Sequence, residues 1–235
     1  MTTQFDTNQP AQIQGIQGYT VDPIFTVGET INGYTPTGIL DGTGAFELNE
    51  TTVRVLVNSE IGSSAGYAYT LENGTSLTGS RIHYFDIDKA TLKIVDSGLA
   101  YDKIYNRAGE VVDEASDLEF EGIQRFCAAN LMEANQFGAG MGFADTIYFA
   151  GEETDGGTEF ALDVQTNELW ALPWLGRAAW ESVTELDTGS MDKVALLVGD
   201  DRGPAPLILY IGNKNVKNDG SFLDLSDLKL FEKDK

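Results

Sequence analysis

Short runs in which apolar and polar residues alternate extend along most of the chain and predict β-strands. Glycine, asparagine and aspartate bound these runs, as is typical of strands joined by tight turns. The predicted strands are residues 52–58, 66–71, 80–86, 92–96, 146–150, 157–163, 168–171, 193–199 and 206–211. Residues 86–91 and 163–167 predict turns closed by Asp and Asn side chains. We therefore expect an all-β fold with little helix.

Two segments predict the remaining helix. In residues 176–186, Arg177, Trp180, Glu181 and Thr184 would share one helical face, and residues 123–130 form a second candidate. The rest divides into an irregular N-terminal arm (1–33), one β-domain (34–224), which includes a long polar connection at 99–121, and a charged C-terminal tail (225–235).

Composition indicates a folded acidic protein. Hydrophobic residues make up 42% of the 235 positions, and the formal net charge is −22. Such a charge repels nucleic acid and anionic membranes, so we expect neither as a partner and consider cations the natural ones. Alternatively, the acidity only keeps the protein soluble. The chain contains no apolar run long enough to cross a bilayer, which predicts no membrane insertion.

The candidate chemistry lies in a cysteine and several carboxylates. Cys127 lies one predicted strand before Glu152 and Glu153. These two glutamates follow the apolar run 147–150. Thiolates suit iron, zinc or copper, whereas carboxylates suit calcium, magnesium, manganese or iron. Because neighbouring side chains of an extended chain point in opposite directions, at most one of the two glutamates should face a shared ion. The alternatives are a buried apolar cysteine and solvated turn charges.

Further carboxylates follow the same pattern. Glu60 comes directly after the predicted strand 52–58, Glu181 follows Trp180, and Asp200 and Asp201 lie in a Gly-Asp-Asp-Arg-Gly turn. A partly buried carboxylate must be paired or coordinated, which makes these residues candidate metal ligands. The alternative for Asp200 and Asp201 is an ordinary Asp-rich turn.

The order of these segments resembles the PhoX type of alkaline phosphatase. That family has a strand ending in Asn-His-Glu, then a Cys-led segment closing on Glu-Glu, then a His-Glu pair and a Gly-Asp-Asp turn. Here the corresponding segments are 56–60, 127–153, 179–182 and 198–203. Ser59 and Trp180 stand where the family pattern has histidine. The resemblance covers residues 34–223.

The resemblance implies a β-propeller with a central cluster of calcium and iron ions that hydrolyses phosphomonoesters outside the cytoplasm, in the periplasm or extracellular space. It implies that the metal ligands come from Cys127, Glu60, Glu152, Glu153, Glu181, Asp200 and Asp201. Arg125 and Arg202 are the cations nearest to them and are candidate contacts for phosphate, although Arg202 could instead neutralise the adjacent aspartates.

Against the family, the chain looks shortened at its C-terminal end. A propeller without its last blades leaves strand edges open, so we expect self-association into a homo-oligomer. The alternative function is that of a non-catalytic, extracellular or surface β-protein that binds calcium. His83 is the only histidine, which excludes His-rich zinc sites, and strand alternation favours cross-strand packing for it.

Overall fold

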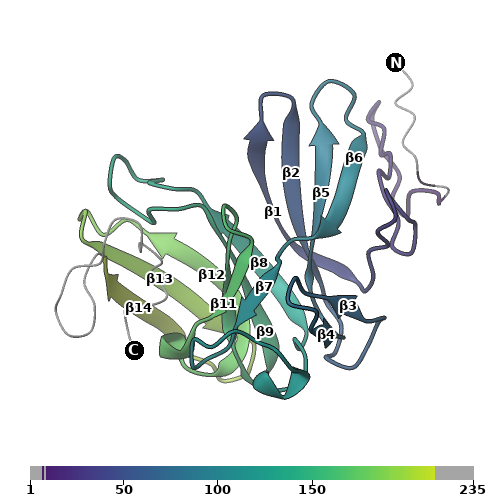
Figure 1. Cartoon of the computed structure of the whole chain (residues 1–235). Helices are drawn as coiled ribbons and strands as arrows, with labels where there is room; N and C mark the ends of the chain where they lie inside the picture. Colours follow the sequence, from purple (N-terminus) through teal and green to yellow (C-terminus); the bar gives the residue numbers. More distant parts are fainter. Residues whose placement is uncertain (1–6, 8, 215–235) are drawn as a thin grey trace.

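Four antiparallel strands form the first sheet in the computed structural model, which describes residues 7 and 9–214. They are β1 (Leu40–Asn49), β2 (Thr52–Ser59), β5 (Ile82–Asp88) and β6 (Ile94–Leu99), in the order β1-β2-β5-β6. Asn49 closes the β1–β2 hairpin by accepting a hydrogen bond from the Thr51 backbone N–H at 3.0 Å. Figure 1 shows this sheet beside the N-terminal arm.

The second sheet has eight strands. Its members are β7 (Lys103–Tyr105), β8 (Phe126–Met132), β9 (Ile147–Gly157), β10 (Glu159–Asp163), β11 (Glu168–Ala171), β12 (Ala178–Leu186), β13 (Lys193–Asp200) and β14 (Leu207–Asn213). The order is β14-β13-β12-β9-β10-β11-β7, and β8 also pairs with β9. A two-stranded ribbon, β3 (Tyr69–Thr70) with β4 (Ser76–Leu77), and two short 3₁₀ turns, η1 (Ala115–Asp117) and η2 (Pro173–Leu175), complete the elements.

Strand β9 is the centre of the second sheet. Its first half is an unbroken apolar run that pairs with β8 and β10, and its second half pairs with β12. Tyr148, Phe149 and Ala150 are at most 1% exposed, as expected for a strand covered on both faces. The start of β9 is thus buried, while its end reaches the surface with polar residues.

Two apolar cores flank β9. Leu56 and Ile82 of the first sheet pack with Tyr148, Phe126 and Phe160 in one core, which joins the two sheets. In the other core, Phe149, Trp180 and Leu196 pack with neighbours from β12 and β13. Successive residues of β9 therefore serve opposite cores, because their side chains alternate across the strand.

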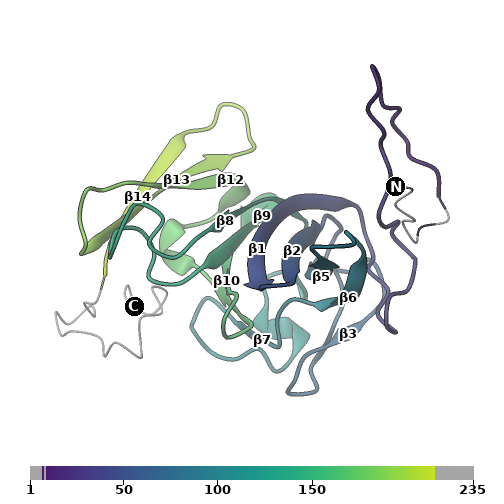
Figure 2. The same ribbon diagram turned by 90° about the horizontal axis from the view of Figure 1, so that it is seen from above.

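The N-terminal arm runs along the outer edge of the first sheet, away from β13 and β14 (Figures 1 and 2). Asn32 Nδ2 donates to the Val95 carbonyl of β6 at 2.7 Å, and the Phe25 and Phe85 rings are 4.9 Å apart between centroids. The arm therefore covers part of an edge that would otherwise expose unpaired backbone groups.

The all-β prediction is confirmed, and every predicted strand overlaps an observed one. The two helix predictions are wrong. Residues 178–186 form β12, in which Val183 and Glu185 are buried between exposed Ser182 and Thr184, a period of two rather than 3.6. Residues 126–132 form β8, which hydrogen-bonds to β9. Neighbouring strands supplied backbone partners that a local pattern does not reveal.

Strand β1 was not predicted, because its glycines weaken a strand pattern. Gly42 is needed there, since a Cβ atom would lie 2.4 Å from the Ala129 nitrogen and 2.5 Å from the Cys127 oxygen. The described strands form open sheets and no ring of blades. Among the described residues, no helix has the length and apolar character needed to span a membrane.

Candidate functional site

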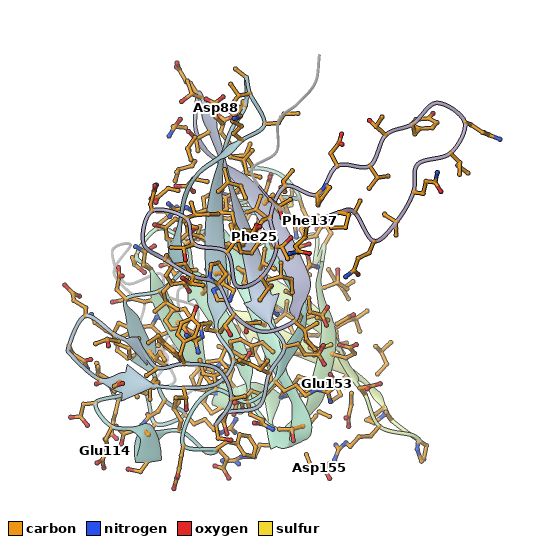
Figure 3. All side chains as sticks on the ribbon, turned by 90° about the vertical axis from the view of Figure 1, so that its right-hand side faces the viewer. Phe25, Asp88, Glu114, Phe137, Glu153 and Asp155 are labelled. Atoms are coloured by element: carbon orange, nitrogen blue, oxygen red, sulfur yellow. The ribbon has the colours of Figure 1, made fainter. Side chains whose placement is uncertain are left out.

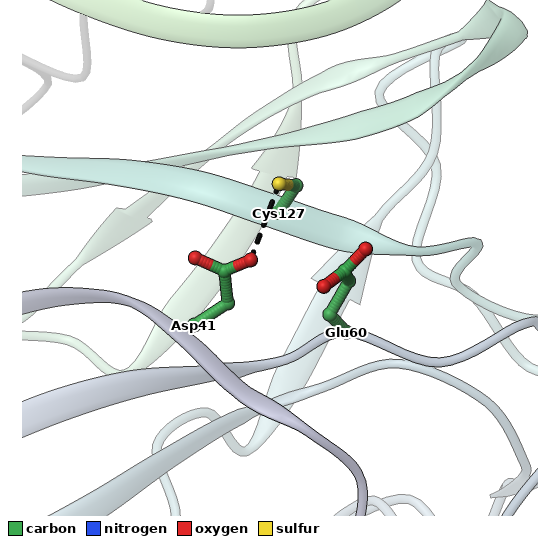
Figure 4. Close-up of side chains that lie close together, drawn as sticks. All are labelled: Asp41, Glu60 and Cys127. Carbon is green, nitrogen blue, oxygen red and sulfur yellow. Dashed lines mark hydrogen bonds between the residues drawn. The ribbon is translucent and has the colours of Figure 1, made fainter. Parts of the chain in front are cut away.

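Strands β1 and β2 of the first sheet and β8 of the second bring a thiol and two carboxylates together where the two sheets meet. Figure 4 shows Asp41 of β1, Glu60 just after β2 and Cys127 of β8 facing one another, and ligand atoms of all three lie within 4.8 Å of each other. The Cys127 thiol donates to Asp41 Oδ2 at 3.2 Å. Carboxylate and thiol donors at such spacing match the ligand types of a metal site.

Strands β9 and β12 add further carboxylates to the same place. Glu181 Oε1 lies 4.0 Å from Cys127 Sγ. Glu153 lies close enough to the Cys127 thiol and to the Asp201 carboxyl group for both to shift its pKa. The backbone N–H of Asp201 is fixed by the Ala179 carbonyl at 2.8 Å. We call the set the acidic–thiol cluster, and it consists of Asp41, Glu60, Cys127, Glu153, Glu181 and Asp201.

Three members of the acidic–thiol cluster lie where a strand carries one extra residue. From Leu40 to Thr43, β1 advances by three residues while its partner β2 advances by two, and Asp41 lies in that interval. Cys127 lies in the corresponding interval of β8 against β9, from 126 to 129. Glu181 lies in that of β12 against β13, from 180 to 183. Such β-bulges re-aim side chains and are frequent beside functional sites.

The only cation in contact with the acidic–thiol cluster among residues 9–214 is Arg125. Its Nε donates to Glu60 Oε1 at 2.9 Å, and its Nη2 lies 2.8 Å from Glu60 Oε1 and 3.2 Å from Glu153 Oε2. The latter contact is an ion pair without hydrogen-bond geometry, because Glu153 Oε2 is buried without a hydrogen-bond partner. The acidic–thiol cluster thus contains five carboxyl groups, and a single guanidinium contacts two of them.

This surplus of negative charge shifts the titration of the cluster. Burial and the hydrogen bonds to Asp41 and Glu153 raise the pKa of the Cys127 thiol well above its usual range. Burial also raises the pKa of Glu153, and burial together with the charge of Asp201 raises that of Glu181. Protons are held where a cation would otherwise balance the charge.

A further carboxyl group is buried behind Glu181. Glu159 of β10 is 0% exposed, and neither of its carboxylate oxygens has a hydrogen-bond partner. A Cβ atom on Gly151 would lie 2.6 Å from Glu159 Oε2 and 2.4 Å from Trp180 Cβ, which places this carboxyl between β9 and β12. Burial first, and then the charge of Glu181, raise its pKa well above the usual range.

Glu152 does not join the acidic–thiol cluster. Its two oxygens accept hydrogen bonds from the backbone N–H groups of Gln124 at 2.8 Å and Thr158 at 2.9 Å. Burial raises its pKa to about 7, and these two bonds limit the rise. The two adjacent glutamates therefore point to opposite sides, as the alternation of an extended strand requires.

Asp200 also stands apart, because it is tied to Arg202. Arg202 Nη2 lies 2.5 Å from Asp200 Oδ2, and its Nη1 lies 2.7 Å from Asp155 Oδ1. The Arg202 guanidinium holds the pKa of Asp200 below its usual range. Figure 3 shows Glu153 and Asp155 at the same end of the molecule, far from the turn at Asp88. Arg202 thus neutralises Asp200 and Asp155, whereas Asp201 faces Glu153.

Sequence reasoning did not single out Asp41 and Glu159. Asp41 follows exposed Leu40 in a glycine-rich stretch, and only the approach of β1 to β8 makes it a neighbour of Cys127. Glu159 opens β10, where it and Asp163 flank the apolar residues Phe160, Ala161 and Leu162. A carboxylate at the start of a short apolar run is a signal that could have identified it.

The sole histidine lies outside the cluster. His83 is fully buried on β5, where its Nδ1 accepts from the Tyr34 hydroxyl at 2.7 Å and its Nε2 contacts the Thr37 carbonyl at 3.0 Å. Burial lowers its pKa to about 4, so the ring is neutral at physiological pH. It connects the arm to the first sheet and supplies no ligand to the acidic–thiol cluster.

Comparison of the sequence with protein-family models, with curated proteins and with solved structures gives no match.

Proposed function

We propose that the acidic–thiol cluster binds divalent metal ions and that the chain uses them to hydrolyse phosphomonoesters. The observation that carries the proposal is that three separate β-bulges turn Asp41, Cys127 and Glu181 toward one another. Each bulge disrupts pairing between strands, so three of them converging on one set of acidic side chains favour a function other than sheet stability.

The donor set fits the metals that the resemblance to the PhoX family implies. Oxygen atoms of Asp41, Glu60, Glu153, Glu181 and Asp201 suit calcium, and the sulfur of Cys127 with carboxylates suits iron. In the described part of the chain, Glu181 Oε2 is buried without a hydrogen-bond partner and Glu153 Oε2 has only its ion pair with Arg125, so a bound metal ion would satisfy both atoms. Membership of that family and a propeller architecture remain part of the proposal.

When bound, the metal ions would polarise the phosphoryl oxygens of the ester and neutralise charge in the transition state. The residues of the chain would hold the metal ions and orient the ester. Arg125 contacts oxygens of Glu60 and Glu153, so a metal ion held by these two carboxylates would free guanidinium N–H groups. Those groups can then donate to the phosphate of a substrate. Arg202 has a weaker claim, because Asp200 and Asp155 occupy it.

The second candidate is a structural calcium site without turnover. Both arginines that could contact phosphate are engaged by carboxylates, which favours this alternative. Carboxylates that folding brings together repel one another, and a cation that binds only the native state relieves this repulsion.

One experiment addresses both candidates. The purified protein is analysed for calcium, iron and zinc, and its hydrolysis of p-nitrophenyl phosphate is measured before and after dialysis against chelator. We expect Cys127→Ser and Glu181→Gln to lose bound metal and hydrolysis, while Glu50→Gln in the exposed β1–β2 turn keeps both. Metal content that is equal in all three variants would refute the metal site. Metal binding without hydrolysis would establish the structural alternative.

A further inference from the structure

Among the residues that the structure describes, Arg81 is a buried cation without a carboxylate counter-ion. Its side chain is 0% exposed, and its guanidinium donates only to backbone carbonyls, from Nη2 to Tyr67 at 2.8 Å and Gly79 at 3.0 Å and from Nε to Gly79 at 3.2 Å. Its Nη1 is buried without any hydrogen-bond partner. No carboxylate in the described part of the chain forms an ion pair with it. Such a charge is costly unless something pairs with it.

Aromatic rings surround this guanidinium but do not neutralise it. Its Cζ lies 4.3 Å from the centroid of the Tyr69 ring and 5.3 Å from that of Tyr67. Burial raises the pKa of Tyr69 to about 12 and also raises that of Tyr34, so both phenols stay uncharged at physiological pH. Neighbouring His83 is neutral as well, because burial lowers its pKa to about 4.

Arg81 lines an open groove of about 580 Å³ between the N-terminal arm and the first sheet. One side of the groove is formed by Gly33 at the end of the arm and by the adjacent Tyr34. The other side is formed by Tyr67 and by Tyr69 of β3, and Leu99 at the end of β6 contributes an apolar surface. Tyr67 is 45% exposed, so one aromatic wall faces solvent. The groove shares no residue with the acidic–thiol cluster.

We propose that this groove binds a small organic anion, whose charged head lies against Arg81 and whose apolar body lies among Tyr34, Tyr67 and Tyr69. A guanidinium has a planar set of donors that matches a carboxylate or a phosphate group. Because Arg81 already occupies the faces of Tyr67 and Tyr69, a cationic ligand would be repelled rather than held by the rings. The net charge of the chain is −22, so its overall electrostatic field repels anions. The unpaired positive charge of Arg81 acts in the opposite direction within the groove.

Calorimetric titration tests the proposal with four probes of one shape: benzoate, phenylphosphonate, benzamide and benzylamine. All titrations contain EDTA, so that no metal in the acidic–thiol cluster can hold an anion, and phenylphosphonate resists hydrolysis. We expect an anionic probe to bind at least about tenfold more tightly than neutral benzamide, as a charge-assisted hydrogen bond predicts. Benzylamine should be the weakest. The ranking of benzoate and phenylphosphonate identifies the preferred head group.

Variants locate the binding. Tyr67→Ala removes a half-exposed wall and should weaken the preferred anion by about fivefold to tenfold. The matched control, Tyr19→Ala, removes a tyrosine that is 77% exposed elsewhere on the arm and should bind as the original chain does. Arg81→Lys retains the charge but loses the planar donors, and it should reduce the preference for anions if it folds. Equal affinity for benzoate, phenylphosphonate and benzamide, or an anion affinity unchanged by Tyr67→Ala, would overturn the proposal.

Discussion

The thiol of Cys127 donates a hydrogen bond to a carboxylate 86 positions earlier in the chain, Asp41 Oδ2, at 3.2 Å. This contact joins β1 to β8 and so couples the two sheets at the acidic–thiol cluster. Burial first, and then this hydrogen bond and the negative neighbours, raise the pKa of the thiol and hold a proton on the sulfur. A metal ion at this place would have to displace that proton, so metal binding and proton release are linked.

The reactivity of Cys127 should report this contact. Alkylation requires the thiolate, so the metal-free protein should react with iodoacetamide more slowly at pH 8 than an ordinary exposed thiol. Asp41→Asn removes one negative neighbour, lowers the thiol pKa and should speed alkylation by about threefold to tenfold. Glu47→Gln, on the same strand and paired with Lys89, is the control and should leave the rate unchanged. If Asp41→Asn reacts no faster than this control, the hydrogen bond is not what protects the thiol.

The stability of the metal-free protein should fall as pH rises through neutrality. The folded-state pKa of Glu152 is raised to about 7 from 4.5, so its contribution is fully present below pH 4.5 and is lost as pH rises through about 7. The full loss is on the order of 3 kcal/mol for this buried group, and about 2 kcal/mol of it falls between pH 5.5 and pH 8. Glu153 and Glu181 shift in the same direction. Urea unfolding in EDTA at pH 5.5 and pH 8 measures the difference, and equal free energies of unfolding would contradict it.

Added calcium should reverse that trend. The metal binds ionised carboxylates of the native state, so its stabilising effect should be larger at pH 8 than at pH 5.5. Thermal melts at several calcium concentrations test this, with Glu181→Gln as the variant that should lose the effect. Midpoints that do not respond to millimolar calcium at pH 8 would exclude a calcium site.

Replacing Glu159 should stabilise the metal-free protein. Its buried carboxyl has no hydrogen-bond partner, and such a group costs about 1 to 3 kcal/mol. Glu159→Met keeps a similar volume and removes the polar atoms, so its unfolding free energy at pH 8 should increase by about that amount. Phe160→Leu, at the adjacent buried position, is the control: it removes apolar volume from the core and should be less stable than the original chain. A less stable Glu159→Met would indicate that the carboxyl has a ligand or water partner.

Gly42→Ala should disturb both the fold and the acidic–thiol cluster. The new Cβ atom would lie 2.4 Å from the Ala129 nitrogen, and this backbone cannot move without separating β1 from β8. We expect a loss of about 1 to 3 kcal/mol of stability and weaker metal binding. Gly199→Ala in β13 is the matched control, because its closest contacts would be an ordinary 3.7 Å or more. Equal melting temperatures for the two variants would mean that β1 has room to shift.

Among residues 7 and 9–214, β14 is an edge strand of the second sheet, and we expect it to mediate self-association. Leu207, Leu209 and Ile211 are 72%, 55% and 58% exposed on one face, while Ile208 and Tyr210 pack against the second core. Leu209→Lys should therefore lower the average mass measured by light scattering at high concentration. The control is Leu92→Lys, which changes an equally exposed leucine in the β5–β6 turn. If the original chain is a monomer at every concentration, the edge of β14 does not mediate self-association.

Periodicity predicted most of the strands, but it missed β1, assigned β8 and β12 to helices and did not give the exact composition of the cluster. Alternating runs located β2, β5, β9, β11 and β13, because burial on one face or both leaves a local signature. The resemblance drew attention to Cys127, Glu153 and Glu181, which the structure does bring together. Asp41 was missed because its place depends on a bulge in a glycine-rich strand. A bulge is set by the register between strands distant in sequence, which no local pattern contains.

Because the ring of His83 stays neutral, carboxyl groups rather than histidine change charge near neutral pH in this protein. Histidine is the usual side chain that changes charge between pH 5 and 8, and here the only one stays uncharged until about pH 4. Carboxyl groups such as Glu152 take over the neutral range instead. Acidification near neutrality therefore removes negative charge inside the protein rather than adding positive charge, and infrared bands of protonated carboxyls, not imidazole signals, are the place to observe it.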